Sequence, residues 1–195
     1  TLVAVWGETQ KMEVTIDDLV ANGTVASNAS TATFSANGFT FKVWTIQTSP
    51  QTGTAGDPIT VNDKQYTYGA NSGGTSDSSK RYIEFTIQKP ATLTVVYESN
   101  KSDASEDRGF SIENEAKGGS ATYTTKTADT VTKELAAGTW YICAYKSINI
   151  YYIGLETADG SYPGVTYNVT TDLGDGSVPS VQTVPKGTIL TLEEP

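Results

Sequence analysis

Short segments in which apolar and polar residues alternate recur along most of this chain. In the clearest of them, residues 82–87, the side chains of Ile83, Phe85 and Ile87 alternate with more polar neighbours. Strict alternation places every second side chain on the same face, which is typical of a strand with one buried face. No window of 12 residues keeps a helical period. Comparable segments are residues 11–17, 39–44, 92–97, 110–112, 140–145 and 148–155.

Roughly eight or nine such segments within the first 155 residues predict an all-β fold. Short strands at this spacing favour a two-sheet β-sandwich of jelly-roll type. A hairpin is predicted around Asn62-Asp63-Lys64, between residues 59–61 and 65–68. The lone Cys143 lies in a strand-like run, where it is predicted to be a small buried residue.

Pro163-Gly164 marks a predicted domain boundary, with the sandwich in residues 1–160 and a short β-rich appendage in residues 161–195. Two strands are predicted in the appendage, at residues 165–170 and 188–192. So short a segment cannot bury an independent core. The tail is similar to the start of small β-grasp repeats in bacterial surface proteins, so it is interpreted as a partial repeat of that kind.

The charge balance excludes some classes of function. The chain has 13 basic and 22 acidic residues and no histidine. Binding to duplex nucleic acid needs a net basic face, so it is not predicted. A cysteine nucleophile or a zinc site normally needs histidine or further cysteines. No apolar run is long enough for a membrane span. No cofactor is predicted with certainty, and calcium stays open because it takes oxygen ligands. The candidate ligands for calcium are Asp17, Asp18, Asp172 and Asp175.

Several of these segments resemble one known family. Residues 80–87, 90–95, 108–112, 138–142 and 148–153 resemble the β-sandwich carbohydrate-binding modules that are appended to bacterial pectate lyases and related plant-cell-wall enzymes. The resemblance covers about residues 6–156 and implies a non-catalytic module that binds plant polysaccharide, with pectic homogalacturonan as the best-known ligand. Members hold uronate carboxylates with basic side chains. The stretch 47–79 is longer than this pattern implies. The matching basic positions are Lys80, Arg81, Arg108 and Lys146.

Each candidate binding residue also has a structural interpretation. The lysines can be ordinary solvated charges. Arg81 and Arg108 share the inward parity of their strands, so they can instead pair with a carboxylate and hold a loop. Tyrosine and tryptophan rings can stack on sugars or pack against the sheet. Trp44 has outward parity, whereas Trp140 is expected in the core. The predicted ligand-binding residues are Lys80, Arg81, Tyr82, Lys101, Arg108, Tyr145 and Lys146.

The predicted function is therefore binding without catalysis. The module would anchor a secreted bacterial enzyme to pectin, outside the cell or at its surface, as part of a larger multi-modular protein. One alternative is an adhesin or spacer module without sugar affinity. Another is a polysaccharide lyase or hydrolase. Glycoside hydrolysis needs two opposed carboxylates, and no motif singles out such a pair.

Overall fold

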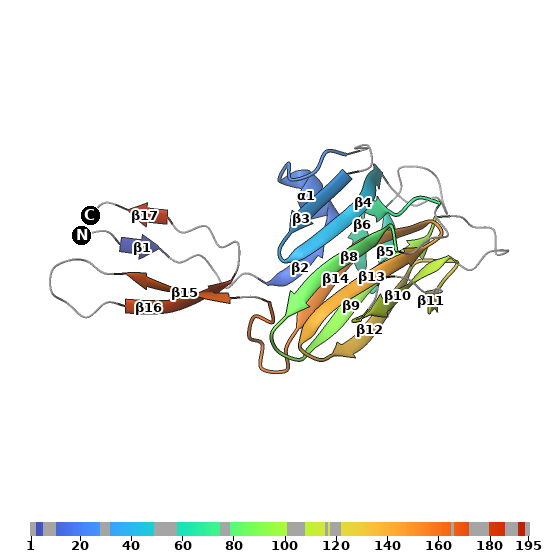
Figure 1. Ribbon diagram of the computed structural model, residues 1–195. Helices are drawn as coiled ribbons and strands as arrows, with labels where there is room; N and C mark the ends of the chain where they lie inside the picture. Colours follow the sequence, from blue (N-terminus) through green and yellow to red (C-terminus); the bar gives the residue numbers. More distant parts are fainter. Residues whose placement is uncertain are drawn as a thin grey trace.

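The computed structural model is built almost entirely of antiparallel strands, with one short helix in the residues that it describes. Two packed sheets form the body, which confirms the predicted all-β sandwich with a β-rich C-terminal extension (Figure 1). The described residues are 3–5, 11–27, 32–48, 58–74, 79–100, 108–115, 117, 122–164, 166–171, 180–185 and 191–193.

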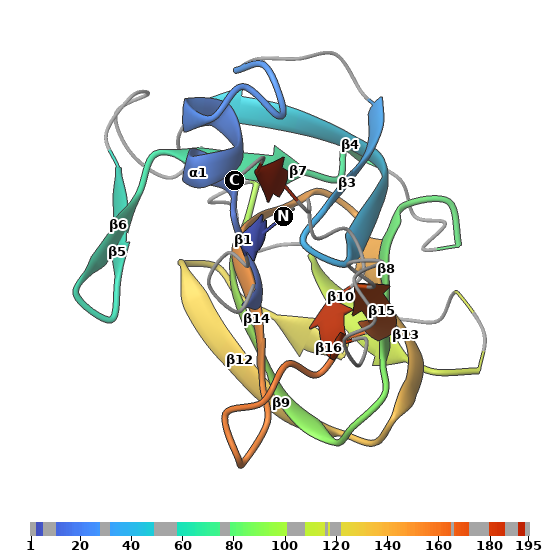
Figure 2. The same cartoon turned by 90° about the vertical axis from the view of Figure 1, so that its left-hand side faces the viewer.

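Two sheets, here called sheet I and sheet II, enclose the core. Figure 2 looks along the sandwich and shows them facing each other. Sheet I has the strand order β11 (Tyr123–Thr124), β10 (Gly109–Glu113), β13 (Gly138–Tyr145), β8 (Tyr82–Ile87), the first half of β4 (Phe39–Thr48) and β3 (Ala32–Ala36). Sheet II begins with β12 (Asp129–Leu135), β9 (Ala91–Ser99) and β14 (Ile148–Glu156). The other edge of β14 pairs with β2 (Met12–Thr15) along one part and with β7 (Tyr68–Asn71) along another. The second half of β4 pairs with β7.

Strand β4 belongs to both sheets because its backbone changes direction at Val43. This valine has a φ of 64° and is 39% exposed. The irregularity shifts the alternation by one residue, so Trp44 points inward and is only 1% exposed. Its indole nitrogen donates a hydrogen bond to the carbonyl oxygen of Tyr82 at 3.1 Å. The expectation that Trp44 faces outward was therefore wrong, because alternation alone does not reveal a bulge.

The apolar side chains predicted from the alternation fill the space between the sheets. Ile83, Phe85 and Ile87 are all buried there. Trp140 belongs to the same core cluster, and Cys143 is completely buried, as predicted for both. The sandwich thus has a continuous apolar interior, against which the residues on its outer faces are fixed.

The predicted strand over residues 11–17 is wrong at its C-terminal end, because β2 stops at Thr15 and helix α1 occupies Ile16–Ala21. Asp17 is one of two acidic residues in the first turn, where the helix dipole favours negative charge. Its carboxylate accepts hydrogen bonds from the backbone nitrogens of Thr67, at 3.0 and 3.1 Å, and of Tyr68, at 2.6 Å. Asp17 therefore anchors the entry to β7.

Calcium ligation by the predicted aspartates receives no geometric support. Among the described residues, no group of three acidic, histidine or cysteine side chains is placed to hold a metal ion. Asp172 and Asp175 lie outside the described residues. Within the described ranges, no helix has both the length and the apolar character that a membrane crossing requires.

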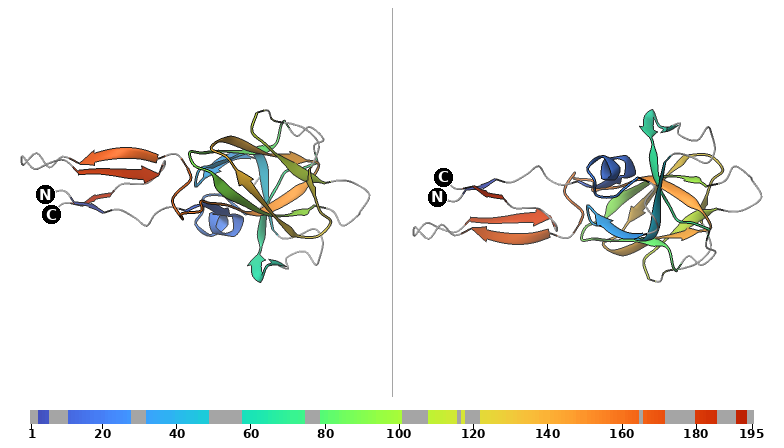
Figure 3. Two further views of the ribbon diagram at one scale, coloured as in Figure 1. Left: turned by 90° about the horizontal axis from the view of Figure 1, so that it is seen from below. Right: turned by 90° about the horizontal axis from the view of Figure 1, so that it is seen from above.

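The predicted hairpin is confirmed as β5 (Ile59–Val61) and β6 (Lys64–Tyr66). Its turn residues Asn62 and Asp63 both have positive φ values, 50° and 62°, as two-residue hairpin turns require. The hairpin packs on the outer face of sheet II and closes a second apolar cluster, and it projects from the body in Figure 3. The buried members of this cluster are Ile59, Val61, Tyr66, Val96 and Tyr151.

The remaining strands lie beyond one end of the sandwich (Figures 1 and 3). Strand β15 (Thr166–Thr171) pairs with β16 (Ser180–Pro185). Strand β1 (Val3–Val5) pairs with β17 (Thr191–Glu193), so the first strand of the chain joins the last. The sequence predicted β15 and the region of β17, but neither β16 nor this terminal pairing. The division of the chain at residue 160 stays a prediction.

Candidate functional site

The strand register brings most of the predicted binding residues to one end of sheet I. Tyr145 of β13 pairs with Gly109 of β10, so Arg108 and Lys146 are the next residues on adjacent chain segments. On the other side of β13, the amide of Ala144 donates to the carbonyl oxygen of Arg81 at 3.0 Å. Lys80 precedes Arg81 and is exposed, whereas Lys101 lies outside the described residues.

The two arginines at this end point inward. The Nη1 atom of Arg81 donates to the carbonyl oxygen of Ser72. A Cβ atom on Gly73 would lie 1.8 Å from the same nitrogen, so the guanidinium packs directly on that glycine. Arg108 is only 7% exposed and shares the inward parity of Phe110. The contacts of Arg81 and the burial of Arg108 favour the structural interpretation of both residues, although Arg81 holds its loop through a backbone carbonyl rather than a carboxylate.

Lys146 occupies the connection between β13 in sheet I and β14 in sheet II. Its φ is 59°, a left-handed conformation that is unusual for lysine. The hydroxyl of Ser72 fixes this turn, since it donates to the carbonyl oxygen of Lys146 at 2.9 Å and accepts from the amide of Ile148 at 3.1 Å. The Lys146 ammonium lies 5.5 Å from the centre of the Tyr145 ring. The turn thus places a cation over an aromatic face.

A buried polar network lies behind this turn. The side-chain amide of Asn71 donates to Oδ1 of Asn149 at 2.7 Å and to the Ser147 hydroxyl at 3.3 Å. Asn149 and the Tyr151 hydroxyl both donate to the carboxylate of Glu98, which is fully buried. Burial, together with the nearby Glu98 charge, raises the pKa of Tyr151 far above its ordinary value. This network fixes the ends of β7, β9 and β14.

A second cation stands over tyrosine rings on the outer face of sheet I. Tyr82 and Tyr141 are neighbours on β8 and β13, with ring centres 5.8 Å apart in an edge-to-face arrangement. The Lys117 ammonium lies 4.2 Å from the centre of the Tyr82 ring and 5.0 Å from that of Tyr141. It also donates to the Tyr82 hydroxyl at 3.0 Å, and this hydrogen bond raises the pKa of Lys117. Glu84 lies 4.0 Å from the same ammonium.

These side chains form one surface, which we name the tyrosine–lysine strip. Tyr141 and Tyr145 have the same parity on β13, and their separation of four residues corresponds to about 13 Å. The outward parity of Tyr141 could have identified it from the sequence, whereas Lys117 lies in a loop that carries no pattern. Flat rings can stack on sugar faces, and ammonium groups can bind carboxylates. The strip comprises Tyr82, Lys117, Tyr141, Tyr145 and Lys146, and we include the exposed Lys80, which lies two residues before Tyr82.

Comparisons with known proteins identify no family. No family model and no curated protein match the chain. One similar solved chain comes from work described as "The complexity of the Ruminococcus flavefaciens cellulosome reflects an expansion in glycan recognition". It is 17% identical, and the alignment covers 80% of this chain and 96% of that chain, with a TM-score of 0.44. A likeness this weak supports no inference about function.

Proposed function

We propose that this chain is a non-catalytic module that binds an acidic plant polysaccharide, with pectic homogalacturonan as the preferred ligand, and anchors a secreted enzyme to it. The observation that carries this proposal is the placement of Lys117 and Lys146 over tyrosine rings on one outer strip of sheet I. The strip offers stacking surfaces and positive charge together, and a uronate polymer presents both sugar faces and carboxylates.

The energetics require several contacts at once. An exposed pair between a lysine and a carboxylate contributes about 1 kcal/mol or less. The three lysines of the strip, Lys80, Lys117 and Lys146, can bind successive carboxylates of one polymer chain. Linked contacts of this kind reinforce one another because later contacts form at high effective concentration. Binding is therefore expected to be moderate in strength and sensitive to salt.

The strip also fits a role without catalysis. Hydrolysis of a glycoside needs a pair of opposed carboxylates. Glu84, on the same face of β8 as Tyr82, interacts with the Lys117 ammonium at 4.0 Å. The module would hold the polymer while a separate catalytic module acts on it.

Affinity electrophoresis in gels that contain low-ester pectin tests this proposal. We expect retardation of the protein that weakens as salt is added. The double variant Lys117→Ala/Lys146→Gly should lose most of the retardation. Lys64→Ala is the matched control, because Lys64 also lies over tyrosine rings, 5.1 Å from the centre of Tyr152, but on the hairpin that covers sheet II.

Three results would contradict the proposal. If Lys64→Ala loses retardation to the same extent as the double variant, the strip is not the specific binding site. No retardation by any glycan would favour the adhesin or spacer alternative. Release of products from pectin by the purified protein would favour a lyase or hydrolase.

A further inference from the structure

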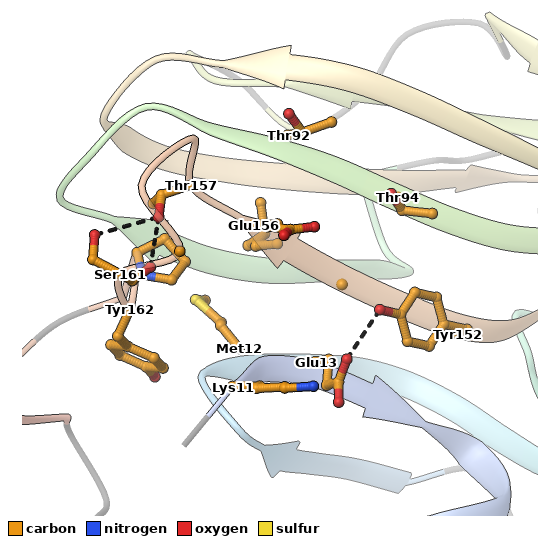
Figure 4. A pocket seen from close by; sticks show the side chains of 14 residues that line it. Lys11, Met12, Glu13, Thr92, Thr94, Tyr152, Glu156, Thr157, Ser161 and Tyr162 are labelled. Carbon is orange, nitrogen blue, oxygen red and sulfur yellow. Dashed lines mark hydrogen bonds between the residues drawn. The ribbon is translucent and has the colours of Figure 1, made fainter. Parts of the chain in front are cut away.

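A cavity of about 300 Å³ opens on the outer face of sheet II (Figure 4). The tyrosine–lysine strip lies on the other layer of the sandwich, on sheet I. The cavity lies over β2, β9 and β14 and is closed at one side by the turn that follows β14. Its volume is at the lower end of the range for small-molecule sites. The lining side chains that give the cavity its polar and aromatic character include Glu13, Thr94, Tyr152, Glu156 and Tyr162.

A glycine forms the floor of this cavity. Gly154 of β14 pairs with Glu13 on β2 and with Thr94 on β9, so it lies at the centre of three strands. A Cβ atom on Gly154 would lie 2.1 Å from the hydroxyl oxygen of Tyr152 and 2.6 Å from its Cζ atom. The Tyr152 ring therefore lies over the glycine instead of standing away from the sheet. Its hydroxyl donates to the Glu13 carboxylate at 3.1 Å.

The opposite wall is rigid as well. The hydroxyl of Thr157 donates to the carbonyl oxygen of Ser161 and to the carboxylate of Asp159, both at 2.7 Å. These bonds close the turn that leads into Tyr162. The Tyr162 ring packs on Gly164, where a Cβ atom would lie 2.6 Å from the ring carbon Cε1. Glycines thus leave room for both tyrosine rings to lie against the backbone.

The charge of the cavity differs from that of the strip. The charged groups that line it are the carboxylates of Glu13 and Glu156 and the ammonium of Lys11. This surplus of negative charge repels a uronate, whereas carboxylate oxygens accept strong hydrogen bonds from sugar hydroxyls. The tyrosines supply aromatic surface for a sugar ring. We infer that this cavity is a second carbohydrate site, which takes an uncharged sugar unit and acts independently of the strip.

Isothermal titration of the full chain with cellohexaose, xylohexaose and mannohexaose tests this inference. We expect at least one of these neutral hexasaccharides to bind, with an affinity that hardly changes with salt. Glu156→Ala should weaken that binding about tenfold or more, because a hydrogen bond to a charged acceptor is lost. Glu113→Ala is the matched control, since Glu113 lies at the end of β10 in sheet I.

Two reciprocal measurements separate this inference from the proposed function. The strip variant Lys117→Ala/Lys146→Gly should bind the neutral ligand like the wild type, and Glu156→Ala should keep its retardation by pectin. The inference is overturned if none of the three hexasaccharides binds. It is also overturned if Glu156→Ala binds as well as the wild type, or if hexagalacturonate competes for the same site with equal affinity.

Discussion

Lys146 combines an unusual backbone conformation with a place in the proposed site. A left-handed conformation costs a non-glycine residue about 1–2 kcal/mol. Two hydrogen bonds of Ser72 hold the turn in this form, and the lysine ammonium lies near the Tyr145 ring as a result. Strain that is held by surrounding structure is typical of functional positions.

Because of this conformation, one substitution at Lys146 should raise stability while it weakens binding. We expect Lys146→Gly to raise the free energy of unfolding by about 0.5–1 kcal/mol, because relief of strain exceeds the entropy cost of glycine. The same variant should bind pectin more weakly. Chemical denaturation measures the first effect, with Lys64→Gly as a control that should be destabilised at an ordinary strand position. Destabilisation of Lys146→Gly would contradict the strain argument.

Tyr97 makes stability depend on alkaline pH. Burial, with a smaller effect from Asp129, raises its pKa to about 12. The unfolded chain releases this proton above pH 10 while the folded chain keeps it, so stability falls as the pH rises from 10 to 12. The loss that Tyr97 causes by pH 12 is about 2–3 kcal/mol. Thermal unfolding of Tyr97→Phe should show a shallower decline over this range, and an unchanged decline would contradict the assignment.

At the scale of elements, the hairpin β5–β6 and the face of sheet II beneath it protect a buried charge. The fully buried Glu98 carboxylate accepts a hydrogen bond from the Tyr151 hydroxyl under this hairpin. This hydrogen bond is strong because the Tyr151 hydroxyl and the Glu98 carboxylate are both shielded from water. Removal of a donor from a buried, charged acceptor is therefore costly.

Tyr151 and Tyr66 lie in the same apolar cluster. Tyr151→Phe should lower the free energy of unfolding by about 1–3 kcal/mol, because a hydrogen bond to Glu98 is lost. Tyr66→Phe makes the same chemical change 6.0 Å away, between ring centres, and should have little effect. Denaturant titration of both variants checks this. Equal loss of unfolding free energy in both variants would show that the hydrogen bond to Glu98 does not cause the destabilisation.

The strands could be predicted from the sequence wherever alternation is regular, as in β8 and β9. Alternation failed at Val43, where positive φ shifts the register, and near Tyr152, where the pairing of β14 with β9 is irregular. It also missed helix α1, since six residues are too few for a helical period. Register is set by long-range pairing, so the sequence could suggest Tyr82, Tyr145 and Lys146 but not the contact of Lys117 with Tyr82 and Tyr141.

At the scale of the whole molecule, the buried core belongs to the sandwich. Both apolar clusters are formed by residues between Met12 and Tyr162. Among the described residues, β1 pairs with β17 and β15 with β16, and a bridge between Ile87 and Gly164 links sheet I to the segment that leads into β15. The division of the chain at residue 160 stays a prediction, and β1, which it assigns to the sandwich, pairs with β17 instead.

We therefore expect a fragment of residues 11–164 to unfold cooperatively, at a temperature close to that of the full chain. Its core clusters are complete, and large cooperative cores determine stability. Differential scanning calorimetry of the fragment and the full chain checks this. Loss of the cooperative transition in the fragment would show that the terminal strands support the sandwich.

The position at which an acidic glycan binds decides whether the tyrosine–lysine strip is the site. Titration of the isotope-labelled chain with hexagalacturonate, followed by two-dimensional amide NMR, tests this directly. We predict that the largest shifts occur at Tyr82, Tyr141 and Tyr145 on the outer face of sheet I, and that salt diminishes them. Shifts confined to sheet II, or no shifts at saturating hexagalacturonate, would contradict the proposed function.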